Sequence, residues 1–446
     1  MQDSSTDRMT HNAYEMVSFA SNVMTLKPGD LVSMGSPTGR RSGGALDTNM
    51  QNRTKIMTLA LLVLSCAAGL RSADEAWHWA GRTSRSAVTI LLLGDINIEN
   101  RADPADAIRN VRATLNSADL VYGNLEGLLV KSQGPDKDIP DKTGWQHIGP
   151  EAVQALKAGH IQAVGVANNV AYGPYNIMKS LAVLDANGIL HTGAGANIDE
   201  AHKPAIITSK GVKIGFLQYT AKWYAQDQQI AAAARPGVAR ILSRDGIIIE
   251  ETDLNRFRED IRRLRPLVDV LIVSSHDRDG LGRPLSPAII AETRPATAIQ
   301  AEDRTRDSLY SPIPLGPQFS ETEAYQKTLA REAIDAGADI VYGHGSHVLQ
   351  GVEIYKGKPV MYCLGNFAMD WIRMSPNREG MVARVVVENK RITRLSLVPL
   401  TRDAQNNVLM LDPASGEGAK LMEKVNKLSG DIRLSLEGKE AVLIDR

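Results

Sequence analysis

Five short apolar runs alternate along this chain with segments that have the spacing of amphipathic helices. The apolar runs are Val88–Leu93, Ala118–Tyr122, Ile161–Val166, Val268–Val273 and Ala338–Tyr342. The helical segments are Pro104–Ser117, Pro150–Gly159, Tyr175–Asn187, Asp253–Leu267 and Glu321–Gly337. Because strand and helix alternate, the pattern predicts a mixed or parallel sheet that is flanked by helices.

Each of the five apolar runs ends in residues that can bind a metal ion. The runs deliver Asp95, Glu126, Asn169, His276 and, in the tract Gly343–His347, a His-x-x-His pair. Open α/β sheets place their ligands at the carboxyl ends of the strands. One polar residue at a strand end is more often a helix cap, and the tract alone is equally explained by a polar turn with two ordinary histidines. Recurrence at five strand ends favours a dinuclear metal centre.

Seven short motifs carry a resemblance to a known family. They are Gly94-Asp95-Ile96, Gly123-Asn124-Leu125-Glu126, Ala167-Asn168-Asn169, His191-Thr192-Gly193-Ala194-Gly195, Gly343-His344, His347-Val348-Leu349-Gln350 and Leu364-Gly365-Asn366-Phe367. In these motifs the chain, from about Ala87 onward, resembles the bacterial capsule-synthesis protein family CapA. The resemblance implies an α/β metallophosphoesterase-like fold of the calcineurin type, a two-sheet sandwich flanked by helices (four-layer αββα). It also implies a role in poly-γ-glutamate capsule production, with the capsule-synthesis membrane machinery and the polymer as partners.

The resemblance further implies a set of metal ligands. Carried over residue by residue, the ligands are Asp95, Glu126, Asn169, His276, His344 and His347. Carboxylate and imidazole together suit Mn²⁺, Fe or Zn²⁺, and we expect two such divalent ions with Glu126 as the bridging carboxylate. In two-metal centres the ions lower the pKa of a bound water and hold the phosphoryl oxygens. No other cofactor is expected.

Three motifs depart from the family pattern. The family has a His after its two Asn residues, where this chain has Val170, and an Asp that precedes Tyr172-Gly173 in the pattern is missing. In related phosphoesterases that His stabilises the transition state or protonates the leaving group, and valine can do neither. The usual His-Trp-Gly-x-Glu and Gly-His-His-Pro-His are altered at His276–Gly280 and Gly343–His347. Asp277–Asp279 offer replacements, although a solvated loop is the simpler interpretation.

Two functions therefore stay open, and no catalytic residue is assigned. One is a metal-dependent, phosphoesterase-like hydrolase of altered or weak activity. The other is a non-catalytic capsule-assembly component that binds polymer or partner proteins. Nucleic-acid binding is unsupported, because Lys plus Arg and Asp plus Glu are both 51 and no basic run is interleaved with aromatic residues. Two cysteines exclude a disulfide scaffold.

Three segments precede the main domain, which we place at 87–446. Residues 1–49 are expected to be non-functional, since 12–39 resemble the C-terminal tail of the fumarylacetoacetate hydrolase family without its upstream metal-binding carboxylates. Residues 50–76 have a basic start and an apolar stretch too short for a comfortable membrane span, which predicts a signal peptide, or a lipoprotein signal with Cys66 lipidated. Residues 77–86 form a spacer. We expect an exported protein of the periplasm or cell surface, with a signal or lipid anchor as its means of membrane association.

The rest of the domain gives weaker signals. Residues 281–319 form an irregular insert without sustained periodicity. The apolar run Lys358–Phe367 predicts one more buried strand, and Met381–Val387 with Ile392–Val398 predict a hairpin. An amphipathic helix is expected at Gly416–Leu428, and a closing strand at Glu440–Ile444.

Overall fold

The structure is a computed structural model that describes residues 76–80, 84–131, 147–221, 229–241, 243–244, 248–277, 322, 324–370 and 377–445. Several predicted features lie outside these ranges. They are the fragment 1–49, the signal segment 50–76 apart from its last residue, Cys66, Arg278, Asp279 and the insert 281–319.

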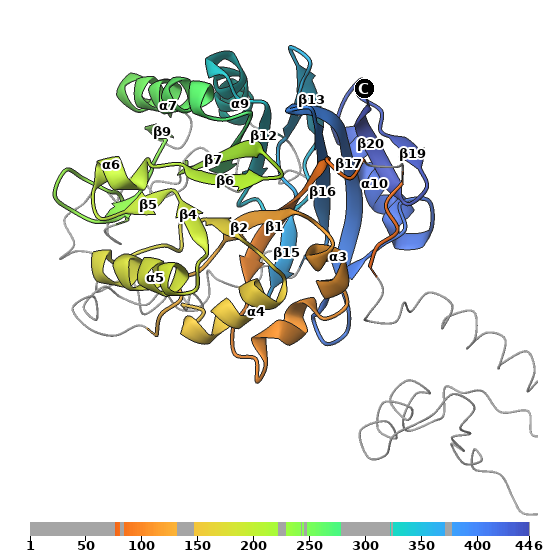
Figure 1. Ribbon diagram of the computed structural model, residues 1–446, viewed down its shortest axis with the longest axis horizontal. Helices are drawn as coiled ribbons and strands as arrows, with labels where there is room; N and C mark the ends of the chain where they lie inside the picture. Colours follow the sequence, from red (N-terminus) through yellow and green to blue (C-terminus); the bar gives the residue numbers. More distant parts are fainter. Residues whose placement is uncertain are drawn as a thin grey trace, which may run out of the picture. The chain divides into compact units, whose positions relative to one another are not determined.

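Two β-sheets form the centre of the domain (Figure 1). The ten-stranded sheet has the order β19 (Ser435–Glu437), β20 (Glu440–Asp445), β17 (Arg391–Arg402), β16 (Gly380–Glu388), β1 (Val88–Asn97), β2 (Leu120–Leu125), β3 (Ala163–Gly165) and β4 (Leu190–Thr192), with β15 (Asn366–Met369) beside β1 and β18 (Val408–Met410) beside β17. The six-stranded sheet has the order β13 (Val352–Tyr355), β14 (Lys358–Met361), β12 (Ile340–His344), β11 (Val270–His276), β7 (Val212–Thr220) and β6 (Ala205–Ser209).

Both sheets are mixed, and each contains a parallel block that was predicted from the alternation of strands and helices. Strands β1 to β4 are parallel neighbours in the first sheet. Strands β7, β11, β12 and β14 are parallel neighbours in the second. The predicted hairpin is β16 and β17, which pair antiparallel, and β16 also pairs antiparallel with β1. The carboxyl ends of the parallel strands therefore lie along one edge of each sheet.

The two sheets face each other across a shared apolar core. Side chains alternate along each strand, so that Ile90 and Leu92 of β1 pack in the core that both sheets share, whereas Leu91 and Leu93 pack in the cluster on the opposite face. Phe216 of β7 belongs to the shared core, and its ring stacks on that of Tyr122 with centroids 4.3 Å apart. Strand alternation thus lets β1 bury both of its faces.

Helices cover the outer faces of the two sheets. The first sheet is covered by η2 (Pro104–Ile108), α3 (Arg112–Asn116), η4 (Pro150–Ala152), α4 (Val153–Ala158) and α5 (Pro174–Ala186). The second is covered by α7 (Glu251–Leu264), α9 (Ala324–Ala336) and α6 (Ile198–Ala201), with η6 (Arg265–Leu267) after α7. Helix α10 (Gly416–Leu428) instead adds Leu421, Met422 and Val425 to the core that both sheets share. The four-layer αββα arrangement expected of the metallophosphoesterase-like fold is confirmed. Among the helices described here, none is both long and apolar enough to cross a membrane.

Smaller strands complete the architecture, and one predicted strand is wrong. Strand β5 (Ala194–Gly195) pairs with β8 (Gly237–Val238), and β9 (Ser243–Arg244) with β10 (Ile248–Ile249). The run Lys358–Phe367 is not one strand but two, β14 and β15, which belong to different sheets. Gly365, with a φ of 67°, lies in the link between them, where the chain crosses from one sheet to the other. An apolar run indicates that a segment is buried. It does not indicate which of the two sheets the segment joins.

Candidate metal centre

Asp95 lies at an irregularity in β1. The register with β2 shifts between Leu92 and Asp95, and the register with β15 shifts between Asp95 and Ile96. A Cβ atom on Gly94 would collide with the carbonyl oxygen of Gly365, so only glycine allows this close approach of the backbone. Bulges of this kind re-aim a side chain beside a functional site.

The other predicted ligands come from both sheets. Glu126 directly follows β2, while His276 and His344 end β11 and β12 and lie opposite each other in register. His347 lies three residues beyond β12 with a φ of 57°, a left-handed conformation that is strained for a residue other than glycine. Strain of this kind concentrates at functional sites, where the surrounding structure enforces it.

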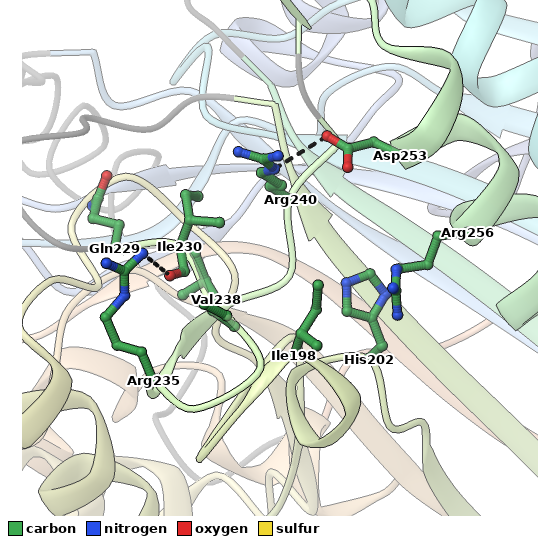
Figure 2. Close-up of a pocket in the computed structure, with 11 residues that line it drawn as sticks. Ile198, His202, Gln229, Ile230, Arg235, Val238, Arg240, Asp253 and Arg256 are labelled. Carbon is green, nitrogen blue, oxygen red and sulfur yellow. Dashed lines mark hydrogen bonds and ion pairs between the residues drawn. The ribbon is translucent and has the colours of Figure 1, made fainter.

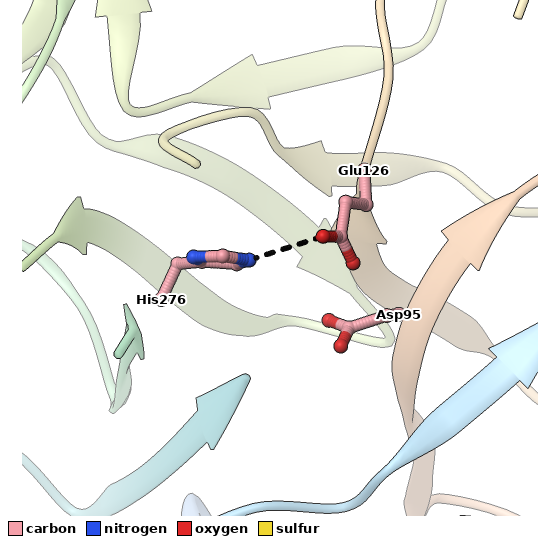
Figure 3. A group of neighbouring side chains, drawn as sticks. All are labelled: Asp95, Glu126 and His276. Atoms are coloured by element: carbon pink, nitrogen blue, oxygen red, sulfur yellow. Dashed lines mark ion pairs between the residues drawn. The ribbon is translucent and has the colours of Figure 1, made fainter. Parts of the chain in front are cut away.

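Carboxylates and imidazoles alternate in the centre. Glu126 Oε1 lies 3.5 Å from His276 Nε2 and 3.5 Å from His347 Nε2. Asp95 Oδ2 lies 3.4 Å from His347 Nδ1, and Asp95 Oδ1 lies 3.1 Å from His344 Nδ1. Figure 3 shows Asp95, Glu126 and His276 converging, and these three residues offer ligand atoms that all lie within 4.8 Å of one another. Glu126 Oε1 therefore lies between the imidazoles of His276 and His347.

Among the described residues, several buried polar atoms of this centre have no hydrogen-bond partner. They are both carboxylate oxygens of Glu126, both ring nitrogens of His276 and Nε2 of His344, and Oδ1 of Asn169 in the turn after β3 is in the same position. A buried polar group without a partner costs about 1–3 kcal/mol, and more when it is charged. Because a carboxylate oxygen and one nitrogen of each neutral imidazole can offer a lone pair, a cation is a suitable partner for these groups. The residues present fit a divalent metal site.

A second layer of residues fixes the orientation of the ligands. Asn124 Nδ2 donates to Asp95 Oδ1 at 2.8 Å, and the Gly345 N–H donates to Asp95 Oδ2 at 3.3 Å. His347 Nδ1 lies 2.9 Å from Asn366 Oδ1. With Nδ1 as the donor, the lone pair of His347 is on Nε2, the nitrogen that faces Glu126. Neither Asn124 nor Asn366 was predicted as a site residue, although both lie inside motifs that carry the family resemblance.

Asp95 remains charged although it is fully buried. Burial alone raises the pKa of Asp95, but hydrogen bonds and charges from His344 and His347 outweigh it and hold the pKa well below its ordinary value. The carboxylate is thus the form present at neutral pH, which is the form that binds a metal ion.

Asn169 and Val170 lie in the buried turn after β3. The Asn169 backbone carbonyl accepts a hydrogen bond from Gln229 Nε2, while its side-chain Oδ1 has no partner among the residues that the structure describes. The Val170 N–H donates to Asn168 Oδ1 at 3.3 Å, and its side chain is buried. The structure thus joins Asp95, Glu126, His276, His344 and His347 through four contacts of 3.1 to 3.5 Å, and it places Asn169 in this turn.

The interpretation of Asp277 as part of a solvated loop is wrong. Its side chain is only 2% exposed, and its Oδ2 accepts a hydrogen bond from Ser275 Oγ at 2.8 Å. Its backbone N–H donates to the His344 carbonyl at 2.9 Å, which ties it to the metal centre. Burial raises the pKa of Asp277, although hydrogen bonds from Ser275 and Gln326 oppose this shift. The polar neighbours Arg278 and Asp279 suggested that Asp277 is exposed to solvent. Its backbone hydrogen bond to His344, at the end of β12, instead holds Asp277 in the interior.

Comparison with known proteins identifies the family. The family model of the bacterial capsule synthesis protein PGA_cap matches residues 84–283 and 292–371. The chain belongs to this family. It is 24% identical to the capsule biosynthesis protein CapA of Bacillus anthracis, over 70% of this chain and 67% of that protein. It is 23% identical to the PGA biosynthesis protein CapA of Bacillus subtilis, over 73% of this chain and 76% of that protein.

Two further similarities complete the comparison. A solved structure of a novel phosphatase from Mycoplasma pneumoniae is 12% identical, with a TM-score of 0.39, over 71% of this chain and 94% of that chain. The C-terminal model of fumarylacetoacetate hydrolase matches residues 1–61, which include the stretch 12–39 where the sequence resembles that family.

Proposed function

We propose that this PGA_cap family member acts in the biosynthesis of a capsule or surface polymer of the poly-γ-glutamate type. The family match and the relatives named for capsule and PGA biosynthesis support this role. We propose further that the protein is exported, because residues 50–76 have the composition of a signal peptide or lipoprotein signal. Its partners are then the membrane machinery of capsule synthesis and the polymer itself.

The centre is proposed to hold two divalent ions of Mn, Fe or Zn. The ligands are Asp95, Glu126, Asn169, His276, His344 and His347. The observation that carries this proposal is the set of buried, partnerless ligand atoms gathered around Glu126. When bound, such ions supply Lewis-acid polarisation of phosphoryl oxygens and an activated water. The protein's own residues orient the site: Asn124 and the Gly345 N–H fix the Asp95 carboxylate, and Asn366 fixes His347.

Metal analysis of purified protein tests the centre. The wild-type chain should retain up to two equivalents of Mn, Fe or Zn after gel filtration, and Asp95→Ala should lose them, because Asp95 lies between two of the histidines. Asp106→Ala is the matched control, since Asp106 is an exposed carboxylate in η2. A wild-type protein that binds none of these metals, or a variant Asp95→Ala that binds them as well as wild type, contradicts the proposal.

Val170 favours a second candidate function, that of a non-catalytic assembly component. The buried valine cannot donate a proton or a charged hydrogen bond where the family pattern has a histidine. Loss of general-acid help commonly costs about 10²–10⁴-fold in rate. Hydrolysis of bis(4-nitrophenyl) phosphate with added Mn²⁺ separates the two functions. Turnover that disappears in Asp95→Ala identifies a hydrolase, whereas metal binding without turnover identifies a binding component.

A further inference from the structure

A pocket of about 350 Å³ lies outside the metal centre (Figure 2). It is formed by residues 229–240 together with residues of α6 and α7, and we call it the arginine pocket. Its lining residues are Ile198, His202, Gln229, Ile230, Ala231, Ala232, Arg235, Val238, Arg240, Asp253 and Arg256. Arg235 and Arg256 stand on opposite sides of it in Figure 2.

The walls of the arginine pocket are hydrogen-bonded to the turns that carry metal ligands. Gln229, which lines the pocket, donates from Nε2 to the backbone carbonyls of Asn169 and Ala171. Arg240 forms an isolated β-bridge with Thr220, whose hydroxyl donates to the His276 carbonyl at 3.4 Å. The pocket therefore contacts the backbone of Asn169 directly and that of His276 through Thr220, so it adjoins the segments that carry two proposed ligands.

The charges of the pocket leave two guanidinium groups for a ligand. Arg240 is neutralised by Asp253, with Nε and Oδ2 3.1 Å apart. Arg256 approaches Asp199 only to 3.7 Å, and both side chains are solvent-exposed, so this pair is weak. Arg235 forms no ion pair with any residue in the described ranges, and its guanidinium donates to the Ile230 carbonyl at 3.0 Å. Among the described residues, Arg235 thus has no carboxylate at ion-pair distance and Arg256 only a weak one, so both guanidinium groups can bind an anion.

The remaining lining selects the kind of anion. Ile198, Ile230 and Val238 provide aliphatic surface between the arginines. The described lining contains no Phe, Tyr or Trp on which a base stacks, and no Ser or Thr to bind sugar hydroxyls. Arginine binds carboxylates through two parallel hydrogen bonds. Two arginines separated by aliphatic surface suit a ligand whose carboxylates are attached through short aliphatic chains.

We propose that the arginine pocket binds an acidic peptide-like chain through Arg235 and Arg256 and holds it beside the metal centre. This inference rests on the proposed role in polymer biosynthesis and names the substrate class of that site. Binding in the pocket requires no metal ion, because none of the lining residues is a proposed ligand. The pocket and the metal centre are therefore testable separately.

The test uses the full chain treated with EDTA and a fluorescently labelled glutamate hexamer, with a glutamine hexamer as the uncharged comparison. The glutamate hexamer should bind, and the glutamine hexamer should not. Arg235→Gln should weaken binding about tenfold, the loss expected for one charge-assisted hydrogen-bonded contact. Arg256→Gln should act in the same direction. Arg112→Gln is the matched control, because Arg112 is an exposed arginine on α3 outside the pocket, and its affinity should equal that of wild type.

Three results overturn the proposal. They are the absence of glutamate-hexamer binding, equal affinity of wild type and Arg235→Gln, and displacement of the hexamer by equimolar inorganic phosphate, which makes phosphate the ligand. The metal content and the hexamer affinity of two variants distinguish this proposal from the proposed metal centre. Asp95→Ala should lose metal and keep hexamer binding, whereas Arg235→Gln should keep wild-type metal content and lose affinity for the hexamer.

Discussion

Glu126 and Glu440 are both fully buried glutamates, but their surroundings differ in a way that predicts stability changes of opposite sign. Both have 0% of their surface exposed. Neither oxygen of Glu126 has a hydrogen-bond partner in the described part of the chain, and its neighbours are His276 and His347 at 3.5 Å. Glu440 accepts hydrogen bonds from Arg384 Nη1 at 3.1 and 3.2 Å, and also from Ser396 Oγ and the Ala80 N–H.

The magnitudes follow from these partners. Replacing Glu126 by Gln removes a buried carboxylate whose two oxygens each cost about 1–3 kcal/mol, and the new amide N–H can donate to an imidazole lone pair. Attraction to the imidazoles offsets part of this cost in the wild type, so we expect Glu126→Gln to stabilise the metal-free protein by about 1–3 kcal/mol. Glu440→Gln leaves the buried Arg384 without its counter-charge and should cost about 3–5 kcal/mol.

Urea unfolding followed by circular dichroism measures both effects. In EDTA, the free energy of unfolding should be highest for Glu126→Gln, intermediate for the wild type and lowest for Glu440→Gln. Mn²⁺ at about 100 times its Kd should then stabilise the wild type and Glu440→Gln by about 2.7 kcal/mol each, and leave Glu126→Gln unchanged. The addition of Mn²⁺ should therefore reduce or reverse the difference in the free energy of unfolding between Glu126→Gln and the wild type.

Two results would refute the reasoning. If Glu126→Gln destabilises the metal-free protein, the Glu126 oxygens must have partners in solution, and the case for a cation at this position fails. If Mn²⁺ stabilises Glu126→Gln as much as the wild type, the ion binds elsewhere.

The remaining predictions concern the backbone at the centre and the export of the chain. Gly343→Ala should destabilise the protein by about 1–3 kcal/mol in urea unfolding, because the new Cβ would collide with the Tyr362 carbonyl oxygen. Unchanged stability would show that β12 and the segment after β14 can move apart at this position. The mature protein should begin near Cys66 or shortly after Ala73 when its N-terminus is sequenced, and recovery of the intact chain from the cytosol, beginning at Met1, would contradict export.

The sequence predicted the strand ends well because two independent patterns coincide there. Apolar runs marked β1, β2, β3, β11 and β12, and the polar residues that follow each run fall at the carboxyl ends of parallel strands. Within each sheet the ends of parallel strands share an edge, and the two facing sheets then bring the ends of β1 and β2 next to those of β11 and β12. The helix expected at Gly416–Leu428 is α10, which has the predicted bounds.

Other features depend on long-range pairing that periodicity does not report. Strand β7 was not predicted, although it lies beside β11 and supplies Thr220, which pairs with Arg240 of the arginine pocket. The pocket itself joins residues 229–240 to α6 and α7, and scattered arginines give no local signal for such a site. Asp277 was misassigned for the same reason, because its burial follows from its place beside β12.

Val170 supplies the most direct test of catalysis. We expect the wild type to be a poor phosphodiesterase, and Val170→His to raise turnover on bis(4-nitrophenyl) phosphate by on the order of 10²-fold, the lower end of general-acid assistance. The turn after Val170 already contacts one imidazole from elsewhere in the chain, since the rings of His147 and Tyr172 have centroids 4.5 Å apart. His147→Gln with unchanged metal content is therefore the control. Suppose that the wild type shows robust turnover and that this turnover disappears in both Asp95→Ala and His147→Gln. His147 would then supply the proton, and Val170 would not abolish catalysis.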